Sequence, residues 1–197
     1  MKKLIPVVVM AVSAMMMVGC NDTKKKMPVV TVSDSIRTSE DYNDTTVYGV
    51  CGEGSSMHMI QLITDSGDTI EYMFGIEDDN PVQGGLLEGD RMAVCGYKTE
   101  DGSLVANKII NLTTLLGKWV SLDKNFEIEE GGTVRNFTNA EKNPWNVWKI
   151  YNGNLLLNRD TFEITSLGAD SLYLENNNGI FTYKRQKNEG GVKLSQK

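Results

Sequence analysis

Short runs of alternating apolar and polar residues, separated by turn residues, fill most of this chain and constrain its fold more than any other feature. In the run Thr69–Gly75, for example, Ile70, Tyr72 and Phe74 would share one face of an extended strand. A period of two is typical of a half-buried β-strand. The preceding segment, Asp65–Asp68, is a turn, because Gly and Asp tolerate the positive φ that tight hairpins require. The pattern therefore predicts an all-β protein.

Five such runs occupy the first half of the chain, and a polar loop with a short spacer separates the third run from the fourth. The spacer ends near Leu87 and is predicted to contain one helical turn. Three strands, a spacer and two strands is the order of an OB-fold barrel. Residues 45–113 are therefore predicted to form a small OB-like barrel whose first and fourth strands are neighbours. The expected strands are Thr46–Gly52, Met57–Thr64, Thr69–Gly75, Arg91–Tyr97 and Leu104–Leu112.

The second half of the chain carries further alternating runs, with Gly and Asn in the turns between them. A spacing near ten residues predicts an antiparallel meander over residues 114–186. The polar tail, residues 187–197, is predicted to be flexible. The expected strands are Phe126–Glu129, Val134–Phe137, Trp145–Tyr151, Asn154–Leu157, Phe162–Leu167, Leu172–Glu175 and Ile180–Arg185.

Several motifs of this second half resemble a known group of domains. Gly117-Lys118-Trp119 opens the meander and Tyr183-Lys184-Arg185 closes it. With the Trp-x-Ile-Tyr strand between them, they resemble the lipocalin-like domains of envelope lipoproteins from Bacteroidetes, and the Gly-x-Trp opening resembles that of true lipocalins. The resemblance implies a lipocalin-like barrel, either small, flattened or filled by its own side chains, because the stretch is short for an eight-stranded cup. It implies no particular activity, because a fold does not determine function.

The N-terminal segment has the features of a bacterial lipoprotein signal peptide. Two lysines precede a nearly unbroken apolar run, Leu4–Val18, which is short for a membrane-spanning helix. Gly19-Cys20 follows and resembles a lipobox, in which the cysteine is acylated and becomes the new N-terminus. We expect residues 1–19 to be the signal peptide and residues 20–44 a lipidated tether. The lipid on Cys20 would hold the chain to a membrane, since more than one acyl chain anchors a protein stably.

The residues just after Cys20 bear on which side of a membrane the chain faces. They include Lys24-Lys25-Lys26 rather than the acidic cluster typical of surface-displayed lipoproteins of the same group. The resemblance therefore implies an envelope location at the outer membrane facing the periplasm, and it disfavours display on the cell surface. An ordinary signal peptide with a chance cysteine, and an uncleaved anchor helix, remain the alternatives.

The chain is acidic, which limits its partners. Its 20 basic and 26 acidic residues give a net charge of −6 at pH 7, and loss of the signal peptide with Lys2 and Lys3 makes this −8. Nucleic acids and anionic lipid surfaces require clustered positive charge. No nucleic-acid partner is therefore expected.

Motifs for catalysis and metal binding are scarce. His58 is the one histidine, and no Cys-x-x-Cys pair is present, so we expect no catalytic metal, no cofactor and no catalytic residues. His58 beside a serine would still permit a hydrolase, although no Gly-x-Ser-x-Gly elbow occurs. The glycine-rich segment Gly52–Ser56 lacks the P-loop lysine and is interpreted as a loop between strands. Glu77, Asp78 and Asp79 fit an acidic surface loop better than a calcium site.

Two sets of residues are the candidates for binding or covalent chemistry. Trp119, Trp145, Trp148 and Tyr151 would line a ligand cavity in the second barrel, or else fill its core. Trp145 and Trp148 are separated by an odd count, so only one of them should point into the core. Cys51 and Cys95 would form a disulfide if the neighbouring first and fourth strands bring them together, or else remain two buried thiols.

These observations lead to three hypotheses for function. The leading one is a non-catalytic binding or scaffolding module of the cell envelope, anchored by lipid, whose partner is an envelope protein, a glycan or an apolar small molecule. The first alternative is a hydrolase of envelope glycans or lipids. The second is a structural subunit of an envelope complex that pairs through its strand edges.

Overall fold

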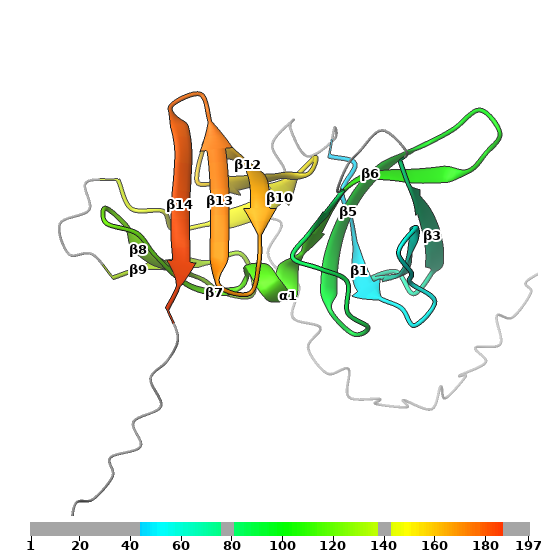
Figure 1. Ribbon diagram of the computed structural model, residues 1–197, viewed down its shortest axis with the longest axis horizontal. Coiled ribbons are helices and arrows are strands. Elements are labelled where there is room, and N and C mark those ends of the chain that lie inside the picture. The colour runs from blue at the N-terminus through cyan, green and yellow to red at the C-terminus, as the bar shows by residue number, and fades with distance from the viewer. Residues whose placement is uncertain (1–43, 76–80, 138–142, 187–197) are drawn as a thin grey trace, which may run out of the picture. The chain divides into compact units, whose positions relative to one another are not determined.

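The computed structural model describes residues 44–75, 81–137 and 143–186, and in these ranges the protein is nearly all β (Figure 1). One sheet closes into a five-stranded barrel, and a second sheet forms a nearly closed barrel of eight antiparallel strands. The predicted all-β class, an OB-like barrel followed by a lipocalin-like meander, is confirmed.

The first barrel is built from β1, β2, β3, β5 and β6, which pair in the order β3-β2-β1-β5-β6. A parallel pairing between β3 and β6 closes the ring. The predicted neighbours, the first and fourth of these strands, are indeed paired antiparallel as β1 and β5. The strand bounds are β1 Val47–Cys51, β2 Met59–Thr64, β3 Thr69–Phe74, β5 Arg91–Lys98 and β6 Leu104–Asn111.

The spacer between β3 and β5 differs from the prediction of a helical turn. It contains β4, Val82–Gln83, which pairs in parallel with β6. Gly84 and Gly85 follow with φ of 93° and 81°, a left-handed conformation that ends the strand and excludes a helical turn. The one helix of the described residues, α1 (Leu112–Leu115), was not expected; Asn111 caps its N-terminus by accepting a hydrogen bond from the backbone N–H of Thr114.

Gly49 in β1 allows the strands of the first barrel to approach closely. A Cβ atom at this position would lie 2.4 Å from the carbonyl oxygen of Ile63 in β2. No side chain fits there without moving backbone, so glycine is required for the tight curvature of a small barrel.

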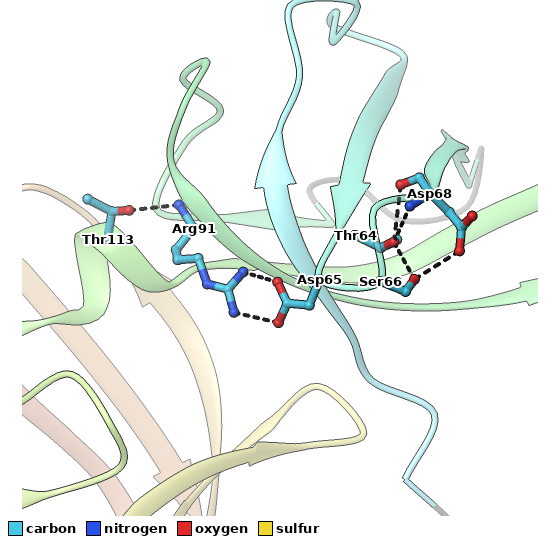
Figure 2. Close-up of polar contacts among 6 residues, drawn as sticks. All are labelled: Thr64, Asp65, Ser66, Asp68, Arg91 and Thr113. Carbon is cyan, nitrogen blue, oxygen red and sulfur yellow. Dashed lines mark hydrogen bonds and ion pairs between the residues drawn. The ribbon is translucent and has the colours of Figure 1, made fainter. Parts of the chain in front are cut away.

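Arg91, the first residue of β5, links the β2–β3 turn to α1, as Figure 2 shows. The guanidinium of Arg91 forms a two-pronged ion pair with Asp65, and its backbone N–H donates to the hydroxyl of Thr113 at 2.8 Å. Within the turn, Thr64 accepts from the N–H of Asp68 at 3.0 Å. Both charged side chains are about half exposed, so the ion pair orients the turn more than it stabilises the fold.

The second barrel is an up-and-down meander in which each strand except β9 pairs with the next in sequence, and β14 returns to pair with β7. The seam between β9 and β10 is joined by the bridge between Thr133 and Val147. At the β10–β11 hairpin, Asn152 and Gly153 have φ of 46° and 77°, the left-handed values that a two-residue turn requires. The bounds are β7 Gly117–Val120, β8 Asn125–Ile128, β9 Val134–Asn136, β10 Trp148–Tyr151, β11 Asn154–Leu157, β12 Asp160–Leu167, β13 Ser171–Asn176 and β14 Gly179–Arg185.

Side chains from all eight strands fill the interior of this second barrel. Strands of three to eight residues enclose little space, and aromatic rings occupy the middle. The ring of Phe126 meets those of Trp145 and Tyr183 edge-on, each at a centroid distance of 5.1 Å. Of the alternatives weighed from the sequence, the filled core is the one that the structure adopts.

One end of the second barrel is closed by Arg185, which connects the first and last motifs of the meander. Its guanidinium lies 4.2 Å from the ring of Trp119 and donates to the carbonyl oxygens of Thr114, Leu116 and Ala169. Gly117 has a φ of 118°, which favours glycine, and a Cβ atom there would lie 2.6 Å from this guanidinium. Gly117, Trp119 and Arg185, from the opening and closing motifs, are therefore in contact at this end.

The two barrels share a hydrophobic core and direct hydrogen bonds within one compact unit. Ala93 and Ile110 of the first barrel belong to the same buried cluster as the interior of the second. The hydroxyl of Tyr48 donates to the carbonyl oxygen of Ile150 at 2.9 Å, and Lys108 pairs with Glu163 at 2.8 Å.

Candidate functional site

An open cavity of about 840 Å³ lies at the end of the first barrel where β1 and β3 terminate. This volume is within the range of small-ligand sites in proteins. Three segments line it: the end of β1 with the β1–β2 loop, the end of β3, and the spacer around β4. The lining residues include Cys51, Glu53, Ser55, Ser56, Met57, His58, Phe74, Val82, Leu86 and Glu88.

The β1–β2 loop is held in place by Gln61 of β2. The backbone N–H of Gly54 donates to Oε1 of Gln61 at 3.2 Å, and the N–H of Gly52 donates to its carbonyl oxygen at 2.8 Å. The hydroxyl of Ser55 accepts from the backbone N–H of Gln61 at 3.0 Å. Cβ atoms on Gly52 or Gly54 would meet the Gln61 amide at 2.5 and 2.6 Å. The glycines of this loop therefore let it fold tightly over one side chain and fix one wall of the cavity.

The lining combines an apolar surface with two acids. Met57, 84% exposed, lies at the mouth, while Phe74, Val82 and Leu86 are partly buried against the barrel core. Glu53 and Glu88 are both exposed, and no lysine or arginine is among the lining residues. The cavity thus offers apolar contact and negative charge.

A row of four exposed or half-buried side chains begins beside the cavity and crosses the outside of the first barrel. Met59 pairs with Met73, Met73 with Val105, and Val105 with Tyr97, so all four lie on the same face of four adjacent strands. Met73 is 56% exposed and Tyr97 55%. We call these four residues the outer row. Methionine side chains are flexible and adapt to varied partners.

The aromatic residues predicted as ligand-lining all lie in the second barrel and are packed. Trp119 is fully buried, and its indole N–H donates to the carbonyl oxygen of Leu115 at 2.9 Å. Trp145 is buried, and its indole N–H bonds to Asp160. Trp148 is half-buried, with its indole N–H bonded to the carbonyl oxygen of Glu129, and Tyr151 lies under the ammonium of Lys149. None of the four lines the cavity of the first barrel.

Of the two alternatives for Cys51 and Cys95, the possible disulfide is not formed in this structure, and both residues are buried free thiols. The strands are neighbours as expected, but they run antiparallel, with Val47 opposite Val94 and Val50 opposite Arg91. This register places the two cysteines at opposite ends of the pair, about 16 Å apart at 3.3 Å per residue. A disulfide requires Cα atoms within about 7 Å. Cys51 also belongs to the barrel core, whereas Cys95 contacts the hydroxyl of Thr46 at 3.3 Å outside that core.

His58 is an exposed residue of the β1–β2 loop rather than part of a strand, because β2 begins one residue later than it. Its backbone N–H donates to the hydroxyl of Ser56 at 3.3 Å, and its carbonyl oxygen accepts from the N–H of Phe74. The hydroxyl of Ser55 contacts the thiol of Cys51 and the backbone of Gln61. These contacts give His58 and the neighbouring serines roles in holding the loop.

The sequence pattern did not identify the cavity as a site, because loops from three separate segments form it. One signal was present: the glycine-rich segment Gly52–Ser56 is the first loop of an OB-like barrel, and OB-folds bind ligands with this loop. Cys20 and the acidic segment Glu77–Asp79 lie outside the described residues. In the described ranges no cluster of three or more potential metal ligands occurs, and no helix there is long and apolar enough to cross a membrane.

Comparisons with family models, with curated proteins and with solved structures found no match to this chain.

Proposed function

We propose that this protein is a non-catalytic binding module of the bacterial cell envelope, anchored by lipid on Cys20, whose ligand site is the cavity of the first barrel. The observation that carries the proposal is the cavity itself, about 840 Å³ in volume and formed by a loop fixed on Gln61. A preformed concave site with mixed polar and apolar lining is the usual form of a binding site.

The second barrel supports the first rather than competing with it as a site. Its interior is occupied by buried aromatic and aliphatic side chains. The shared core and the bond from Tyr48 to Ile150 join it to the outer surface of the first barrel. We infer that the second barrel stiffens β1, β5 and β6, and through them the rim of the cavity.

A thermal-unfolding assay on the full chain tests this proposal, since a ligand that binds only the native state raises the melting temperature. The probes are a short peptide, a disaccharide of amino sugars and palmitate, one from each expected ligand class. The Ser56→Trp variant fills the mouth of the cavity, and Ser166→Trp, on an exposed position of β12, is the matched control.

At least one probe should stabilise the wild type and the Ser166→Trp variant but not Ser56→Trp. Equal stabilisation of all three proteins would show that the ligand binds elsewhere. Failure of every probe to shift the wild type would count against a binding module with this site.

A further inference from the structure

In the described part of the chain, the carboxylates are the only charged side chains that line the cavity besides the ionisable His58. Among its lining residues Glu53 and Glu88 are acidic, and none is lysine or arginine. Glu71, exposed on β3, lies on the same face as Met73, beside the outer row. Anionic ligands would be repelled by this group, and a cationic group would be attracted.

The apolar lining supplies the second part of the ligand's chemistry. A lysine or arginine side chain carries its charge on an apolar stem. In the cavity, Val82 and Leu86 provide surface for such a stem, and Phe74 provides an aromatic ring on which a cation can rest. Met57 stands exposed at the mouth.

The outer row extends this site over the outside of the barrel. Met57 at the cavity mouth and Met59 at the start of the row are two residues apart, and Phe74 is adjacent to Met73. Four strands at about 4.8 Å spacing give the row a length of about 14 Å, which about four extended residues would span. An extended chain can therefore contact the row and the cavity together.

We propose that the cavity binds one lysine or arginine side chain of an extended segment of a partner protein, and that apolar residues of that segment lie on the outer row. This inference rests on the proposed function, because it names the ligand class of the same cavity. It depends on one more feature, the continuity of an acidic cavity with a methionine-rich surface.

The test measures binding of three ten-residue fluorescent peptides to the full chain. The first peptide contains two lysines among leucines and serines. In the second peptide glutamate replaces both lysines, and in the third methionine replaces both lysines. The lysine peptide should bind the wild type most tightly. The double variant Glu53→Gln/Glu88→Gln should bind it about fivefold more weakly, as expected for two exposed charge pairs.

Matched controls separate the site from general attraction to an acidic protein. Glu175→Gln, which removes an exposed acid from β13, should leave affinity within about twofold of the wild type. Met73→Ser changes an exposed residue of the outer row. It should weaken binding of the lysine peptide without unfolding the protein.

Several results would overturn the inference. Equal affinity for the lysine and glutamate peptides would show that the cavity does not recognise a basic side chain. Equal effects of the Glu53/Glu88 and Glu175 variants would show the same. Either result would still leave the cavity as a site for another ligand. The ligand would be a free amine rather than a protein segment if spermidine displaced the lysine peptide completely and the Met73→Ser variant bound that peptide as tightly as the wild type. Unchanged binding of the lysine peptide to Ser56→Trp would remove the cavity itself and with it the proposed function.

Discussion

Arg185 holds together the end of the second barrel that it closes. Its guanidinium bonds to three backbone carbonyls and covers the buried ring of Trp119. Partial burial lowers the pKa of Arg185, which indicates that these partners replace much of its hydration. Arg185→Ala should reduce the free energy of unfolding by about 3 kcal/mol in urea denaturation, because carbonyls are left without a donor. The neighbouring Lys184→Ala, at an exposed position, should change it by less than about 0.5 kcal/mol; equal effects would contradict the role given to Arg185.

Ionisation of Tyr48 makes the contribution of the contact between the barrels to stability dependent on pH under alkaline conditions. Burial, with a smaller contribution from the nearby Asp44, raises the pKa of Tyr48 from 10.0 to about 12. A raised pKa means that the neutral phenol is stabilised in the folded state, so its contribution is complete below pH 10 and is lost as pH rises toward 12.

The Tyr48→Phe variant lacks this ionisation. Unfolding measured in urea between pH 9 and about 12 should therefore show a steeper loss of stability for the wild type than for the variant. Parallel curves would mean that the phenol of Tyr48 is as accessible to water in the folded chain as in the unfolded one.

The β1–β2 loop, residues 52–58, is the element whose order decides the shape of the cavity. Gln61→Ala removes the oxygen that accepts from the N–H of Gly54, and it should lower stability by about 1 kcal/mol and speed amide exchange at Gly54. The control is Glu71→Ala, which removes a partner of the Gln61 Nε2 but leaves Oε1 in place. If exchange at Gly54 rises equally in both variants, the loop is held by other contacts.

At the level of elements, alternation and turn chemistry were sufficient for much of the fold. The run Asn154–Leu157 matches β11, and the Asn152-Gly153 turn lies where the sequence indicated. Short-range patterns do not encode register, however, so the antiparallel offset that separates Cys51 from Cys95 could not be read from the matching sequences Val50-Cys51-Gly52 and Val94-Cys95-Gly96. β4 was missed because a strand of two residues has no period, and its pairing with β6 depends on residues distant in sequence.

The candidate site was harder to predict than the fold for a related reason. Aromatic residues are common ligand contacts, and the sequence therefore suggested Trp119 and Trp145. Both are buried in the core of the second barrel, because a barrel with short strands needs large side chains to fill it. The cavity instead uses Gly, Ser and Glu residues from loops, whose types are common at any surface. Only the closed geometry of the first barrel brings them together.

For the whole molecule, the lipid anchor remains a prediction from the sequence. If Cys20 is the acylation site, cells fed labelled palmitate should incorporate label into the wild-type chain and not into the Cys20→Ser variant. Cys51→Ser and Cys95→Ser, which replace the buried thiols, serve as controls and should retain the label. Label in the Cys20→Ser variant would show that another residue carries the lipid.

Ligand binding is assigned above to the first barrel, and the distribution of two residue types allows this assignment to be measured directly. Met57, Met59, Met73 and Met92 all lie in the first barrel, whereas the chain's three tryptophans lie in the second. Methionine-methyl and indole N–H signals of the full chain can be followed together by NMR while the lysine peptide is added. We expect shifts of the Met57, Met59 and Met73 methyl signals, with the signals of the fully buried Met92 and of all three indoles unchanged. Shifts of the indole signals with unchanged methyl signals would instead place the ligand site in the second barrel.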